Sequence, residues 1–178
     1  DIMGIRTIPA ALRRLISDGH QMNTAEPNYA QVSADGTTKY GFLSSQGHPY
    51  EAAYMPGGKR STLCISTQSG CRMGCSFCHT GGMGFRAQLS ADEILSQLLS
   101  LPQRAKVNRI VLMGMGEPLD NFETVIRALS ILNAHWGLAF GASNITLSTV
   151  GIMPELHVLI GKKLCNIAIS LHSPWPDE

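Results

Sequence analysis

The chain has 178 residues, of which 44% are hydrophobic, so it can bury one substantial core. Its 14 basic and 13 acidic residues give a formal charge of +1, and this near balance neither favours nor excludes a nucleic-acid partner. The sequence opens without a basic, apolar leader and contains no run of about 18 apolar residues. We therefore expect a cytoplasmic protein with no membrane partner.

Residues 1–57 are expected to form an N-terminal accessory region. Apolar residues at i, i+3, i+4 spacing predict a short helix over 10–16. Stretches rich in Tyr, Val, Thr and Phe, separated by two turn signals, predict an antiparallel ribbon over roughly 29–55. A Pro-Gly-Gly-Lys-Arg connector at 56–60 leads from the ribbon into the rest of the chain.

Residues 58–178 alternate between strand-like and helix-like segments. The predicted strands cover residues 61–66, 109–113, 144–149 and 164–171. The predicted helices begin at the Ser90–Glu93 capping box, at a cap on Asp120 or Asn121, and at Pro154. Such alternation predicts an α/β fold with parallel strands and helical crossovers, as in a TIM-like barrel or a doubly wound sheet. Because a complete eight-stranded barrel takes about 250 residues, we expect only the N-terminal part of a TIM-like barrel.

Three of the five cysteines, Cys71, Cys75 and Cys78, fall within eight consecutive positions. Such clustering suits a metal site in a reducing compartment better than a disulfide scaffold. Three thiolates on one loop can ligate three irons of a four-iron cubane and leave the fourth iron open. The alternatives are a structural zinc ion with Cys64 or His79 as fourth ligand, and ordinary reduced cysteines.

Polar residues stand at or just beyond the carboxyl ends of the other predicted strands. Glu117 follows the second strand, Ser148 and Thr149 end the third, and Ser170 and His172 end the fourth. Parallel α/β folds assemble their active sites at this edge. Taken singly, Glu117 would be a solvated loop acid and each serine a strand-end hydrogen-bonding group. Their shared position predicts one site together with the cysteine loop.

The spacing Cys-x-x-x-Cys-x-x-Cys, with Phe77 just before the last cysteine, resembles the signature of the radical S-adenosylmethionine superfamily. We expect Phe77 to shield a cluster from water. Several separated blocks from about Ile8 to the last residue resemble the RlmN/Cfr family of RNA adenine methyltransferases, and RlmN more than Cfr. These blocks are 35–37, 51–56, 62–71, 114–119, 147–151 and 169–174.

The resemblance implies a [4Fe-4S] cluster on Cys71, Cys75 and Cys78, whose open iron binds S-adenosyl-L-methionine. It implies that Gly116 and Glu117 contact the methionine amino group of this cofactor. A carboxylate beside an ammonium group is independently a favourable charge-assisted pair. The further cofactor-contacting positions that the resemblance implies are Ser148, Ser170, Leu171 and His172.

The family's chemistry implies a two-stage methyl transfer through a methyl-carrying cysteine near the protein's C-terminus. Cys64 matches the second cysteine, which resolves the covalent enzyme–RNA adduct through a transient disulfide, and Glu51 matches the proton acceptor at the adenine. The resemblance assigns no catalytic role to Cys165 and puts the methyl-carrying cysteine beyond Glu178. We therefore expect these 178 residues, as a fragment lacking the C-terminal part, not to complete methyl transfer alone.

The resemblance implies 23S rRNA and tRNA as substrates, an electron donor such as flavodoxin, and a monomeric enzyme. RlmN-type enzymes methylate carbon 2 of adenine, and this is the function we favour for the chain. The alternatives are Cfr-type methylation of carbon 8, a radical enzyme acting on a peptide or small molecule, and a non-catalytic zinc module.

Overall fold

The computed structural model describes residues 9–19, 24–173 and 175. Its strands are β1 Tyr29–Val32, β2 Thr38–Leu43, β3 Pro49–Met55, β4 Ser61–Cys64, β5 Gln68–Ser69, β6 Ala87–Gln88, β7 Val107–Leu112, β8 Ile145–Thr149 and β9 Asn166–Ile169. Its α-helices are α1 Ala10–Gly19, α2 His79–Gly82, α3 Ala91–Leu99, α4 Phe122–Asn133 and α5 Glu155–Lys162. Three 3₁₀ turns lie at Arg104–Lys106, Pro118–Asn121 and Ala142–Asn144.

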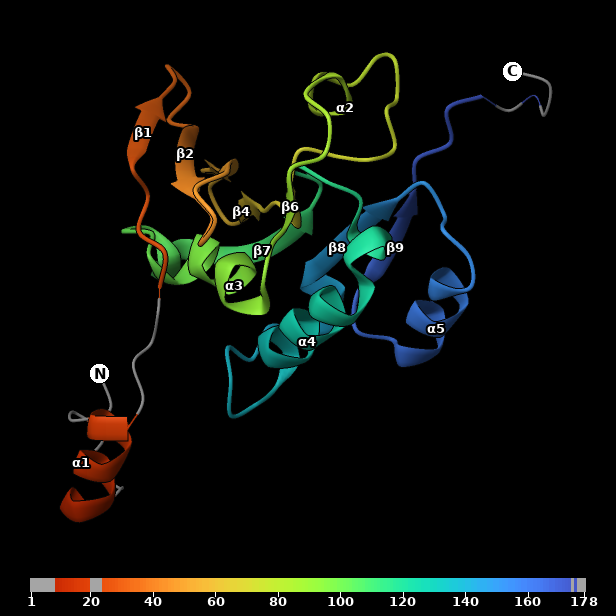
Figure 1. Ribbon diagram of the computed structural model, residues 1–178. Coiled ribbons are helices and arrows are strands. Elements are labelled where there is room, and N and C mark those ends of the chain that lie inside the picture. Colours follow the sequence, from red (N-terminus) through yellow and green to blue (C-terminus); the bar gives the residue numbers. More distant parts are fainter. Residues whose placement is uncertain (1–8, 20–23, 174, 176–178) are drawn as a thin grey trace.

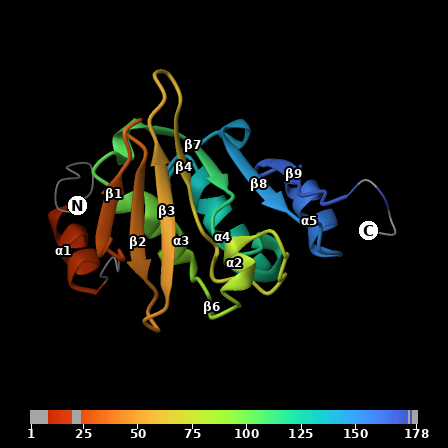
Figure 2. The same ribbon diagram turned by 90° about the horizontal axis from the view of Figure 1, so that it is seen from above.

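One seven-stranded sheet, ordered β1-β2-β3-β4-β7-β8-β9, runs through the molecule (Figure 2). The ribbon strands β1 to β3 and strand β4 pair antiparallel, whereas β4, β7, β8 and β9 pair parallel. The parallel strands are the four strands that the sequence predicts. The pairing of Ala53 with Cys64 joins the ribbon directly to them, so the ribbon extends the sheet. A domain boundary between residues 57 and 58 stays a prediction.

Helices α3 and α4 lie side by side against one face of this sheet (Figure 1). Their apolar stripes bury Ile94 and Leu129 in the core, where strand residues Ile110, Ile145 and Leu147 are also buried. Helix α3 begins at the predicted capping box: Ser90 Oγ accepts from the Glu93 amide, and the Ser90 amide donates to the Glu93 carboxylate. The helices therefore cover the core and leave the carboxyl ends of the strands free for other residues.

Helix α1 stands apart from the sheet in Figure 1 and extends the predicted helix from residue 16 to Gly19. Its side chains Leu12 and Leu15 are 46% and 70% exposed. No described helix combines the length and apolar character needed to cross a lipid bilayer.

The cysteine loop leaves and rejoins the fold through a second, two-stranded sheet that the sequence analysis does not predict. Gln68 pairs with Gln88 and Ser69 with Ala87, so the chain from 70 to 86 closes as a loop. Gly70 has a φ of +74°, and a Cβ there would lie 1.8 Å from the carbonyl oxygen of Gly84. Only glycine lets the two ends of the loop approach this closely.

The prediction that a side chain caps helix α4 is correct in position but wrong in its hydrogen bond. Asn121 occupies the N-cap position, but its side chain forms no cap hydrogen bond. The side-chain Nδ2 of Asn121 instead donates to the carbonyl oxygens of Thr67 and Leu89, at 2.9 and 2.8 Å. Thr67 precedes β5 and Leu89 follows β6, and both carbonyl oxygens are buried. Because a buried carbonyl without a donor costs free energy, the Asn121 side chain binds these two groups instead of capping the helix. Asn121 therefore ties the second sheet to the connection after β7.

Candidate active site

A cavity of about 550 Å³ opens at the carboxyl ends of the parallel strands. The loops after β5, β7, β8 and β9 all contribute to its walls. Every predicted cluster or cofactor residue lines it: Cys71, Cys75, Cys78, Gly116, Glu117, Ser148, Ser170, Leu171 and His172. In Figure 1, the cysteine loop with α2 and the segment after β9 lie on the same side of the sheet. The structure thus brings together residues that are up to about a hundred positions apart in the chain.

The cysteine loop presents three half-buried free thiols to this cavity. Burial is the main cause that raises the pKa of the Cys71 thiol. Cys75 Sγ lies 3.9 Å from His172 Nε2, and the His172 ring meets Phe77 edge-on with 4.9 Å between ring centroids. Phe77 lines the cavity and is 72% exposed, and its shielding of a cluster from water stays a prediction.

The donor set fits a multi-iron cluster better than one metal ion. No three of the described His, Cys, Asp or Glu side chains are grouped so that they could hold a single ion. A structural zinc ion needs four such ligands converging on one point. In a cubane each thiolate binds a different iron, so three thiols spread around one cavity suit it. The residues present therefore fit a [4Fe-4S] group with three cysteine ligands.

The Glu117 carboxylate is buried, with only 4% of the residue exposed. Its Oε1 accepts hydrogen bonds from the Leu119 amide at 2.9 Å and the Thr149 hydroxyl at 2.6 Å. Its Oε2 accepts from the Val150 amide at 3.0 Å. Three donors from two loops hold the group in one orientation at the cavity wall. Thr149, one of the polar residues that the sequence places at the strand ends, therefore helps to orient the carboxylate of the site.

Gly116 brings the Glu117 loop against β5. Its φ is +99°, and a Cβ there would lie 2.5 Å from the Cβ of Gln68. Gln68 Oε1 in turn accepts a hydrogen bond from the backbone amide of Glu117, at 2.8 Å. A side chain at position 116 would therefore displace the carboxylate that follows it.

The ends of β8 and β9 meet at two serines. Ser148 and Ser170 are hydrogen bonded through their hydroxyls at 2.9 Å. Leu171, the next residue along the chain, is 72% exposed and lines the cavity. A pair of hydroxyls beside an apolar side chain offers both hydrogen-bonding and apolar contacts to a bound molecule.

Glu51 and Cys64 line a neighbouring cavity of about 260 Å³ rather than the first one. They lie on the paired strands β3 and β4. Met113 and Gly114 line both cavities, so these two residues form the wall between them. The structure thus separates the predicted catalytic pair from the predicted cofactor residues by one short segment.

Glu51 is held from one side by two donors. Both the Tyr29 hydroxyl and the Lys39 ammonium group, 3.1 Å away, contact its Oε1. The hydrogen bonds to Glu51 raise the pKa of Tyr29 and of Lys39, so both keep their protons at neutral pH. Among the described residues, Oε2 of Glu51 has no hydrogen-bond partner. It is the oxygen that stays available to accept a proton.

The two remaining cysteines differ in position. Cys64 ends β4 at the wall of the smaller cavity, and burial raises the pKa of its thiol. Cys165 lies just before β9 and lines neither cavity, and burial raises its pKa to about 11. The structure therefore places Cys165 away from both cavities.

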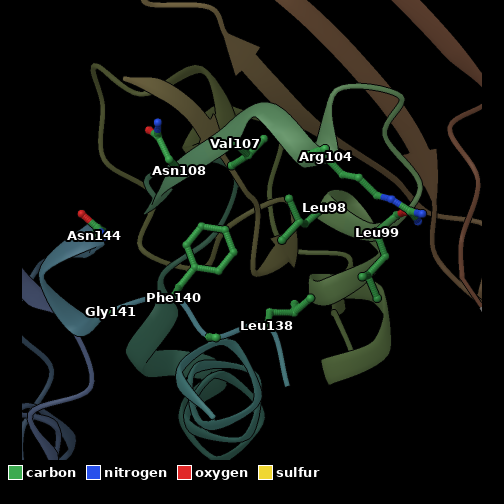
Figure 3. A pocket seen from close by; sticks show the side chains of 11 residues that line it. Leu98, Leu99, Arg104, Val107, Asn108, Leu138, Phe140, Gly141 and Asn144 are labelled. Carbon is green, nitrogen blue, oxygen red and sulfur yellow. The ribbon is translucent and has the colours of Figure 1, made fainter. Parts of the chain in front are cut away.

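A third cavity, also of about 550 Å³, lies at the opposite ends of the strands, between α3, the start of β7 and the segment before β8 (Figure 3). Leu98, Leu138 and Phe140 line it, and the described residues at its wall include no cysteine, histidine or carboxylate. Active sites of parallel α/β folds lie at the carboxyl ends of the strands instead. We therefore assign the candidate site to the cysteine-lined cavity.

A family model described as "Radical SAM superfamily" matches residues 65–177. The chain belongs to the radical SAM superfamily, and its parallel strands are part of the fold of that superfamily. Membership implies S-adenosylmethionine and a [4Fe-4S] cluster as cofactors.

Similar proteins have names that are more specific than the superfamily. A Bacteroides fragilis protein named "Probable dual-specificity RNA methyltransferase RlmN" is 45% identical over 166 residues, which are 93% of this chain and 48% of that protein. A Porphyromonas gingivalis protein of the same name is 40% identical over 178 residues, or 52% of its length. The crystal structure of a radical SAM methyltransferase from Sphaerobacter thermophilus matches with a TM-score of 0.87 and 35% identity, covering 99% of this chain and 54% of the other. The chain spans about half the length of these proteins.

Proposed function

We propose that Cys71, Cys75 and Cys78 hold a [4Fe-4S] cluster and that S-adenosylmethionine binds beside it in the larger cavity. When bound, the cluster supplies the electron for reductive cleavage of S-adenosylmethionine. The observation that carries this proposal is that all nine predicted cluster and cofactor residues line one cavity.

Glu117 is the group that we assign to the amino group of the cofactor. Its carboxylate is already oriented by three donors, so little reorganisation accompanies binding. A buried carboxylate gains a strong charge-assisted hydrogen bond from an ammonium group. Ser148, Ser170, Leu171 and His172 would contact other parts of the cofactor.

In the smaller cavity, we assign Glu51 as proton acceptor at the substrate base and Cys64 as the thiol that resolves an enzyme–RNA adduct. The free Oε2 of Glu51 supports the first role. The position of Cys64 on the wall of the same cavity supports the second. Because Met113 and Gly114 line both cavities, a substrate base in one would lie close to the cofactor in the other.

For the whole protein we propose methylation of carbon 2 of an adenine in 23S rRNA and tRNA through a methyl-cysteine intermediate. The names of the relatives and their identity of 40–45% over at least 93% of this chain support this assignment. An electron donor such as flavodoxin, a monomeric state and a cytoplasmic location stay predictions.

Anaerobic reconstitution tests the cofactor part of the proposal. We expect brown protein with iron and sulfide each near four per chain, and release of deoxyadenosine when reductant and S-adenosylmethionine are added. Colourless protein with stoichiometric zinc would contradict it. Mass spectrometry of nucleosides from treated RNA then distinguishes 2-methyladenosine from 8-methyladenosine. Deoxyadenosine release without RNA methylation by the whole protein would favour a peptide or small-molecule substrate.

A further inference from the structure

The cysteine loop and the loop that carries Glu117 are linked by a chain of polar side chains. Arg72 directly follows the first cluster cysteine, and its guanidinium nitrogen lies 3.6 Å from Oδ1 of Asp120. The other oxygen of Asp120 accepts from Gln68 Nε2 at 2.6 Å, and Gln68 Oε1 accepts the Glu117 amide at 2.8 Å. The link therefore runs from a cluster-binding loop to the backbone of the residue assigned to the cofactor's amino group.

Asp120 sits at the junction of this link. Gln88 donates to both the carbonyl and the Oδ2 of Asp120, at 2.8 and 3.3 Å, and also accepts from Gln68 at 2.9 Å. Gln68 is fully buried and the Asp120 side chain is 19% exposed. The carboxylate thus satisfies buried amide donors with one oxygen and faces the cysteine loop with the other.

Arg72 is held at its end of the link by a second contact. Its guanidinium carbon lies 3.8 Å from the centroid of the Phe85 ring, on the other arm of the same loop. The Arg72 side chain is 50% exposed, so the ion pair by itself contributes little free energy to folding. Its effect is geometric: the planar guanidinium spans the cysteine loop and fixes it against Asp120.

We propose that Asp120, through Arg72 on one side and Gln68 on the other, is a positioning residue that sets the placement of the cluster loop relative to Glu117. This inference rests on the proposed function, in which the cysteine loop binds the cluster and the loop of Glu117 binds the amino group of S-adenosylmethionine. Losing the link leaves every proposed ligand in place but lets the two halves of the site move relative to each other.

The test is a double-mutant cycle on S-adenosylmethionine affinity with Arg72→Gln, Asp120→Asn and the double variant. Asp120→Asn keeps one oxygen to accept from Gln68 and replaces the charged oxygen that faces Arg72 with an uncharged NH2 group. We expect each single variant to weaken binding by about two- to fivefold, which corresponds to a partly exposed ion pair, and the double variant to be no weaker. Iron per chain and the melting temperature should stay at wild-type values.

Arg86→Gln is the matched control, because Arg86 is an exposed cation of the same loop that forms no ion pair within the described part of the chain. It should bind S-adenosylmethionine like the wild type. Wild-type affinity in either single variant, or losses that add in the double variant, would overturn the inference. A wild-type protein that binds four irons but shows no change in the electron paramagnetic resonance of its cluster with S-adenosylmethionine would instead overturn the proposed function.

Discussion

The hydroxyl of Thr149 lies 2.6 Å from Oε1 of Glu117, so the last residue of β8 holds the carboxylate that follows β7. The two residues are 32 positions apart and both are almost fully buried. Because β7 and β8 are neighbouring parallel strands, their carboxyl ends meet at the same edge of the sheet. The sheet order thus sets the orientation of an acidic group at the candidate site.

This contact predicts that Thr149→Val weakens S-adenosylmethionine binding by at least about tenfold, since a hydrogen bond to a charged group contributes about 1.5–3 kcal/mol. Isothermal titration of the reconstituted protein measures the affinity. Thr146→Val is the control, because Thr146 lies on the same strand with no side-chain hydrogen bond among the described residues. Equal affinity of the two variants would show that Thr149 does not hold Glu117 in its binding orientation.

Replacing a cluster cysteine should remove the iron. We expect Cys71→Ser to reduce iron and sulfide per chain after reconstitution to near zero, because two thiolates hold a cubane poorly. Cys165→Ser should retain wild-type iron, since Cys165 lines neither cavity at the carboxyl ends. Iron content and visible absorbance give the result directly. A Cys71→Ser protein with four irons would contradict the assigned ligand set.

Glu51→Gln should lower the rate of RNA methylation by the whole protein by about 10²–10⁴-fold, the usual contribution of a general base. Release of deoxyadenosine without RNA should be unchanged, because Glu51 lines the other cavity. Tyr29→Phe should have a smaller effect, since Lys39 still contacts Oε1. Glu123→Gln, at an exposed position on α4, is the control. Full activity in Glu51→Gln would remove Glu51 from the mechanism.

The Cys64 thiol should react slowly with alkylating reagents near neutral pH. Burial raises its pKa above the ordinary value of 9.0, and the folded state therefore favours the neutral thiol over the reactive thiolate. The rate should keep rising as pH increases through 9, whereas a free cysteine begins to level off there. Peptide mapping after iodoacetamide treatment resolves each cysteine. A rate for Cys64 that levels off below pH 9 would contradict the effect of burial.

Gly70→Ala should destabilise the fold more than Gly47→Ala does. Both glycines have positive φ, +74° and +78°, so both variants carry about 1–2 kcal/mol of backbone strain. Only at position 70 would the new Cβ also meet backbone, 1.8 Å from the Gly84 carbonyl oxygen. Urea unfolding of both variants measures the difference. Equal losses would mean that the cysteine loop does not need this close approach.

The sequence predicts the parts of the site that depend on local periodicity. The Ser90 capping box, the four parallel strands and the polar residues at their carboxyl ends follow from patterns within about ten positions. Those patterns place the cysteine loop, Glu117, Ser148, Ser170 and His172 on one cavity, because parallel strands share an edge. Gly116 and Leu171, which line the same cavity, were implied only by the family resemblance.

The remaining features depend on contacts between distant residues. Strands β5 and β6 have two residues each, too few for any alternation to be visible. The side chain of Asn121 bonds carbonyls 54 and 32 positions away instead of its own helix. The exposure of Phe77 and its contact with His172 likewise depend on where the segment after β9 passes. The two partners of each interaction lie too far apart in the chain for a local sequence pattern to predict their contact.

The register between β3 and β4 links the ribbon to the chemistry of the smaller cavity. Ala53 pairs with Cys64, and Glu51 lies two positions before Ala53, on the same face of the strand. Shifting the pairing of β3 with β4 by one residue would place Glu51 and Cys64 on opposite faces of the sheet. The pairing register therefore controls whether acid and thiol share a compartment.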